Sequence, residues 1–171
     1  KMDYNDVLLV VNNKSALSLQ IGDYFKQARG ILDLNVCHIN VSASEVISSG
    51  EFATLRTQIE DYLNTNNLTD KINYIVMTEG CPLKYGGSGG YTYACVDSEL
   101  TLILGPYKNS IGGDYWVENP YFGEEKPFSR ATYGIYLVNR LTGYTWPEIK
   151  GLVDNATVSL NVTGKCVLDV D

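Results

Sequence analysis

The chain has 171 residues, of which 44% are hydrophobic and 19% charged, and its formal net charge is −7. This composition excludes a disordered tail, and the length fits one domain over residues 1–171 with its own core. No apolar run approaches the ~20 residues that cross a bilayer, so we expect no membrane span. Because the cations are scattered in an acidic chain, we expect no nucleic-acid partner.

The first half of the chain alternates short apolar runs with amphipathic segments. The run at 6–11 is typical of a central parallel strand that is covered on both faces, and the segments at 35–41 and 72–77 are expected to be the second and third strands. Between them, the spacing of apolar residues predicts one helix from Ser15 to Gly30 and another over 50–64. This alternation predicts right-handed crossovers and a parallel sheet.

The second half is less regular. A short helix is expected over 96–104, and residues 105–132 form a long aromatic loop. A fourth strand is expected at 133–138, and a capping box beginning at Thr145 predicts a helix to about residue 158. A fifth strand at 165–170 is cut off at its end, which indicates one domain of a longer protein.

These elements predict a three-layer α/β fold, caspase-like or flavodoxin-like, with a mostly parallel sheet in the order 2-1-3-4-5. In such a sheet, ligands bind at the carboxyl ends of the strands, in the crevice where the strand order reverses.

Several polar residues follow the predicted strands and would meet in this crevice. They are Asn12, Asn13, Ser15, Thr78 and Glu79, with Arg140 from the fourth strand. The amides at the start of the helix near Ser15 favour an anion, although Glu79 would oppose one. The alternative is that these residues only cap helices and form turns.

Asp97 and Glu99 bracket Ser98 just before an apolar helix. The helix dipole favours acids at this position, and Ser98 is a suitable N-cap. Helix capping alone therefore suffices to explain all three residues. The alternative is that Asp97, Glu99 and Arg140 converge on one polar site, because the planar fork of arginine pairs with carboxylates.

The four cysteines are Cys37, Cys81, Cys95 and Cys166. They have no Cys-x-x-Cys spacing, and the lone His38 cannot complete a zinc site, so we expect no metal centre. Cys81 and Cys95 flank a glycine-rich loop, and they form either a disulfide, if the compartment is oxidising, or two buried thiols.

Asn-X-Ser/Thr acceptors are more frequent than the about two expected by chance. The acceptor residues are Asn13, Asn40, Asn67, Asn155 and Asn161. The excess favours a glycoprotein that is extracellular or on the cell surface, although a chain rich in Asn and Thr also produces unused acceptors.

The long loop combines aromatic and acidic residues. Its aromatic residues Tyr115, Trp116, Tyr121 and Phe122 either pack the loop onto the domain or form a platform for a carbohydrate or a partner surface. Its acids Asp114, Glu118, Glu124 and Glu125 are oxygen ligands of the kind that calcium prefers, but their spacing fits no EF-hand. We expect no other cofactor.

Seven segments together resemble a family of uncharacterised prokaryotic exported proteins. They are Tyr4–Asn12, Tyr24–Ile31, Asn35–Cys37, Ile59–Leu63, Tyr74–Leu83, Val96–Leu100 and Tyr136–Leu141. The resemblance covers nearly the whole chain and implies an exported protein, but it implies no activity.

More distantly, the layout resembles the gingipain and caspase-like peptidases, which place a His-Gly after the third strand and a Cys after the fourth. Here the third strand is followed by Thr78–Cys81 without a histidine, and the fourth ends at Arg140 without a cysteine. His38, in the second strand, would lie roughly 10 Å from Cys81 by strand spacing, too far for a catalytic pair.

The sequence therefore favours a non-catalytic structural or binding module whose partners are other domains, surface proteins or carbohydrate. The alternative is a hydrolase with a site at Glu79, Asp97, Glu99 and Arg140, and a gingipain-like cysteine peptidase is less favoured.

Overall fold

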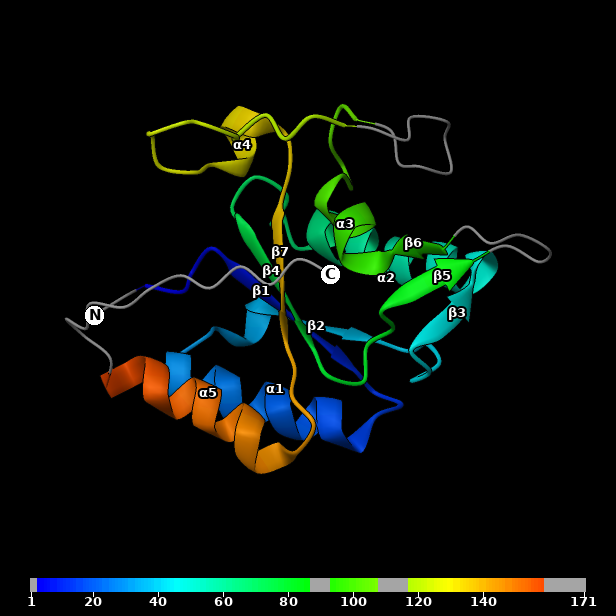
Figure 1. The fold of residues 1–171 in the computed structure, drawn as a ribbon. Helices are drawn as coiled ribbons and strands as arrows, with labels where there is room; N and C mark the ends of the chain where they lie inside the picture. Colours follow the sequence, from blue (N-terminus) through cyan, green and yellow to red (C-terminus); the bar gives the residue numbers. More distant parts are fainter. Residues whose placement is uncertain (1–2, 87–92, 108–116, 159–171) are drawn as a thin grey trace.

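The computed structural model describes residues 3–86, 93–107 and 117–158, which form an α/β fold with two sheets (Figure 1). The larger sheet has four parallel strands in the order β2-β1-β4-β7. They are β1 (Val7–Asn12), β2 (Val36–Ile39), β4 (Tyr74–Thr78) and β7 (Leu137–Leu141). The parallel sheet and the order of its first four strands are confirmed, and the expected fifth strand at 165–170 lies outside the described residues.

Helices cover both faces of this sheet. Helices α1 (Ala16–Arg29) and α5 (Trp146–Val158) lie together on one face. Helices α2 (Ser49–Thr65) and α3 (Val96–Thr101) lie on the other face (Figure 1). A 3-10 turn, η1 (Asp33–Asn35), leads into β2. The chain therefore has the three layers that the alternation of strands and helices predicted.

The central strand β1 is buried along its whole length. Leu8 and Val10 belong to the larger core cluster, which also contains the inner face of α2. Leu9 and Val11 belong to a second cluster on the α1 side. Because successive side chains of a strand point to opposite faces, a continuous apolar run fits a strand that is covered on both sides.

Local signals fix the ends of the helices. Ser15 caps α1 by accepting a hydrogen bond from the amide of Ser18, and Gly30 ends the helix with a φ of 68°. Helix α2 begins with a capping box formed by Ser48 and Glu51. These polar groups satisfy backbone amides that have no partner inside the helix.

The smaller sheet was not predicted. Its strands β3 (Val46–Ser48), β5 (Lys84–Gly86) and β6 (Tyr93–Cys95) pair in the order β3-β5-β6. The ring of Tyr85 stacks on Phe52 of α2, with 4.0 Å between the ring centroids. This contact attaches the sheet to the larger core cluster, which contains both residues.

The fourth strand lies later in the chain than the predicted 133–138. Residues Arg130–Tyr133 form the short helix α4, which ends at Gly134 with a φ of 72°, and β7 begins at Leu137. Gly134 adopts the left-handed conformation that ends helices, so the apolar run is divided between two elements. The long loop accordingly ends at α4.

Helix α1 packs closely on β1 at Gly22, where an added Cβ would lie 2.3 Å from Cγ1 of Val11. We expect Gly22→Ala to lower the free energy of unfolding by about 1–2 kcal/mol, because overpacking outweighs the gain in helix propensity. Gly151→Ala in α5 is the matched control: no atom lies within 4 Å of its added Cβ, so stability should rise by up to about 1 kcal/mol. Urea denaturation measures both, and equal effects would contradict the close packing at Gly22.

Candidate functional site at the strand ends

The predicted crevice between β1 and β4 is occupied by the turn that follows β4. Asn12 is fully buried, and its Nδ2 donates to the carbonyl of Gly80 at 2.9 Å. Its Oδ1 accepts from the amide of Lys14 at 3.2 Å. A Cβ on Gly80 would lie 2.2 Å from Oγ of Ser15, so this turn rests directly on the start of α1. Asn12 and Ser15 thus lie together, and both bond to the protein backbone.

Beneath this turn lies a buried hydroxyl network that sequence reasoning missed in part. Ser18 and Thr78 are fully buried, and their hydroxyl oxygens lie 2.6 Å apart. Ser18 accepts from the amide of Asn12 at 2.7 Å, and Thr78 donates to the carbonyl of Val10 at 2.9 Å. A serine on the inner face of an amphipathic helix was the available signal, since a buried hydroxyl requires a partner.

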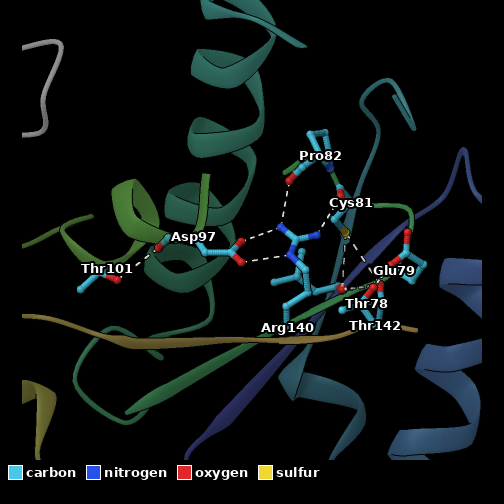
Figure 2. A network of polar contacts seen from close by, with 9 residues as sticks. Thr78, Glu79, Cys81, Pro82, Asp97, Thr101, Arg140 and Thr142 are labelled. Carbon is cyan, nitrogen blue, oxygen red and sulfur yellow. Dashed lines mark hydrogen bonds and ion pairs between the residues drawn. The ribbon is translucent and has the colours of Figure 1, made fainter. Parts of the chain in front are cut away.

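Arg140 and Asp97 form the principal charged contact at this edge (Figure 2). The guanidinium binds both carboxylate oxygens of Asp97, through Nε at 3.0 Å and Nη2 at 2.6 Å. The same group donates to the carbonyls of Cys81, at 2.8 Å, and Pro82, at 2.9 Å. Four of the five guanidinium N–H groups, one on Nε, one on Nη1 and two on Nη2, therefore bond to the protein.

The other two acids of the predicted cluster lie apart from this pair. Glu79 contacts the hydroxyl of Thr142, and its amide donates to the carbonyl of Leu141 at 3.0 Å. Glu99 is 6% exposed and lies in the wall of a cavity between α3 and β7. The structure thus brings Asp97 and Arg140 together and places Glu79 and Glu99 elsewhere.

The expected cap of α3 differs in detail. The helix begins at Val96 after Cys95, so Asp97 and Glu99 lie in its first turn as the dipole favours. Ser98 lies inside that turn and does not cap the helix. This correction follows from the start of the helix at Val96, which is three residues earlier than a Ser98 cap requires.

The three cysteines that the structure describes are thiols. Cys37 and Cys81 are buried and Cys95 is exposed at the end of β6, so the Cys81–Cys95 disulfide is not formed. The sulfur of Cys81 instead faces the carbonyl of Val10 at 3.9 Å and the hydroxyl of Thr78 at 3.8 Å. Cys166 lies outside the described residues.

Burial determines the protonation of the two inner thiols. It raises the pKa of Cys37 to about 12. It also raises the pKa of Cys81, and hydrogen bonding to Thr78 and the charge of Arg140 offset this only in part. His38 is exposed, and its Nδ1 lies 2.7 Å from Oδ1 of Asn13. A protonated, buried Cys81 is a poor nucleophile.

The described part of the long loop packs against the domain. The rings of Tyr121, Phe128 and Tyr133 form a cluster with centroids 5.0 to 5.8 Å apart. Phe122 is 88% exposed, whereas Tyr115 and Trp116 lie outside the described residues.

Arg130 was also missed from the sequence. Its guanidinium binds Asp70 at 2.6 Å and lies 5.1 Å from the ring centroid of Tyr136. It also donates to the carbonyl of Leu104. Arg130 thereby links the end of the long loop to the segment that follows α3.

Neither a metal-ligand cluster nor a membrane-spanning helix is found in residues 3–86, 93–107 and 117–158. Within these ranges, no group of three or more His, Cys, Asp or Glu side chains is arranged to hold a metal ion. Asp114, one of the four acids considered for calcium, lies outside the ranges. No helix in the described part of the chain is both long and apolar enough to span a membrane.

No protein family, curated protein or solved structure matches this chain significantly. The resemblance to exported prokaryotic proteins and the likeness to caspase-like peptidases therefore stay predictions.

The Asp97–Arg140 pair is expected to stabilise the fold, because only 10% of the Arg140 side chain and 24% of the Asp97 side chain are exposed. Asp97→Asn should lower the free energy of unfolding by about 1–3 kcal/mol, since it removes a charge partner from a largely buried guanidinium. Arg56→Gln breaks the more exposed pair with Glu60, and it should lower the free energy of unfolding by about 0.5 kcal/mol or less. Equal losses in urea denaturation would show that Arg140 does not hold the edge together.

Thiol labelling should follow burial. In the native protein at neutral pH, iodoacetamide should modify Cys95 first, because the raised pKa values of Cys37 and Cys81 leave these buried thiols protonated. In denaturant all three should react. Peptide mapping by mass spectrometry measures the order, and rapid native labelling of Cys81 would indicate an activated thiol.

Proposed function

We propose that this chain is a domain of an extracellular or cell-surface protein and works as a non-catalytic structural or binding module. The observation that carries this proposal is the set of bonds made by Arg140, which go to Asp97 and to the carbonyls of Cys81 and Pro82. A guanidinium that holds a turn and a helix against the sheet has a structural role, and it leaves few donors for a substrate.

The hydrolase alternative needs its four residues in one pocket. Only Asp97 and Arg140 are in contact, while Glu79 pairs with Thr142 and Glu99 faces the α3–β7 cavity. The cysteine peptidase alternative needs an activated thiol, but burial raises the pKa of Cys81 and His38 is bonded to Asn13. These arrangements favour the non-catalytic module.

The acceptor asparagines support an extracellular location. Asn13, Asn40, Asn67 and Asn155 all have exposed side chains, and Asn161 lies outside the described residues. Glycans are bulky and require surface positions, so these four sites are compatible with glycosylation. Phe122 is the exposed aromatic side chain in the described part of the long loop, and it is available there to contact a carbohydrate or a surface protein.

The proposed location is tested on cells of the native source. An antibody raised against the folded chain should label intact cells or the secreted fraction as strongly as permeabilised cells. Intact mass of the native protein should show added sugar at one or more acceptor sites, removed by Asn→Gln substitution there. A protein that is labelled only after permeabilisation and carries no sugar would contradict this location.

The absence of catalysis is tested separately with chromogenic ester, phosphate, glycoside and peptide substrates, which the purified chain should not turn over. Glu79→Gln is the matched variant, because Glu79 lies at the edge of the sheet outside the Arg140 contacts. Turnover that Glu79→Gln abolishes while stability is unchanged would overturn the proposal in favour of the hydrolase.

A further inference from the structure

A cavity of about 480 Å³ lies between α3, the β7 region and residues 117–120. Figure 1 shows α3 beside β7 on the face of the sheet that also carries α2. The volume is within the range of about 300–1,000 Å³ that is typical of small-molecule sites. This cavity is separate from the strand-end crevice, which the turn at Gly80 fills.

The described polar groups that line the cavity are acidic or neutral. Glu99 lies in its buried wall and Glu118 is exposed at its rim. Thr101 and Asn119 add a hydroxyl and an amide. Among the described residues that line the cavity there is no lysine, arginine or histidine. The charged side chains among these described lining residues are therefore both negative, and the overall charge of −7 also favours a cation over an anion.

The remaining wall is apolar. Leu102 of the segment after α3 and Ile135 before β7 both line the cavity, and Ile135 is only 2% exposed. Sites of this kind bind a ligand body through apolar contacts, while a few polar groups fix its orientation. The wall therefore fits a short hydrocarbon chain, and the carboxylates fit a positive charge at its end.

We infer that this cavity binds a small organic cation, an ammonium or guanidinium group on a short apolar stem. This inference rests on the proposed binding function and names the chemistry of its ligand. The cation comes either from a free amine or from a lysine or arginine side chain of a partner protein, because both present the same group. Ion pairing in a partly enclosed site is stronger than at an open surface, so Glu99 should contribute more than Glu118.

The experiment is a binding titration of the whole chain at low salt, followed by NMR chemical shifts. The probes are 1,4-diaminobutane and a short lysine-containing peptide, with butyrate as the matched anion. The amines should bind saturably and more weakly as salt increases, whereas butyrate should not bind. Tighter binding of the peptide would identify a partner side chain, and tighter binding of the diamine a free amine.

Two variants test the site. Glu99→Gln should weaken amine binding by about tenfold or more, and Glu118→Gln by a smaller factor. Glu118→Gln changes an exposed side chain, so it keeps the test valid if Glu99→Gln fails to fold. Glu125→Gln, an exposed acid that does not line the cavity, is the control and should leave binding unchanged.

The inference would be overturned if neither amine binds saturably, if butyrate binds as well, or if the two site variants bind like the control. In each case the proposed function still stands if the substrates are not turned over and the protein is found at the cell surface. Turnover of a substrate would instead contradict the proposed function, whether or not the amines bind.

Discussion

The burial of β1 on both faces is the constraint on which the rest of the fold depends. All six of its residues are buried, so neither face of the sheet can be left to solvent. Helices must then cover both faces, and parallel neighbours must reach β1 through crossovers. As a result β1, β4 and β7 end along one edge, where the turn at Gly80 and the guanidinium of Arg140 meet.

Closing that edge requires hydrogen-bond donors as well as apolar contacts. The carbonyls of Cys81 and Pro82 lie in a part-buried turn, and an acceptor left without a partner there would be costly. Arginine meets this need because its planar fork can bind two carbonyls and a carboxylate together, which the compact ammonium of lysine cannot do. The edge where an open α/β sheet commonly binds ligands is thus used for structure.

The continuous apolar run of β1 made this strand predictable, because a strand covered on both faces needs no polar side. β2, an edge strand whose His38 is exposed, and β4 were predictable as short, mainly apolar segments between helical patterns. The position of β7 was not predictable in the same way, since the conformation of Gly134 divides one apolar run between a helix and a strand. The three-residue strands of the smaller sheet are too short to show a period, and they depend on contacts such as that of Tyr85 with Phe52.

The pairing of Asp97 with Arg140 was among the predicted alternatives, because both lie near one edge and arginine matches a carboxylate. Glu99 could have been excluded from that cluster. Residues two apart on a helix point away from each other, so α3 directs Asp97 toward Arg140 and Glu99 toward the cavity. The ion pair and the burial of Val96 and Leu100 in the core agree on one rotation of this short helix, and that rotation determines which acid faces the cavity.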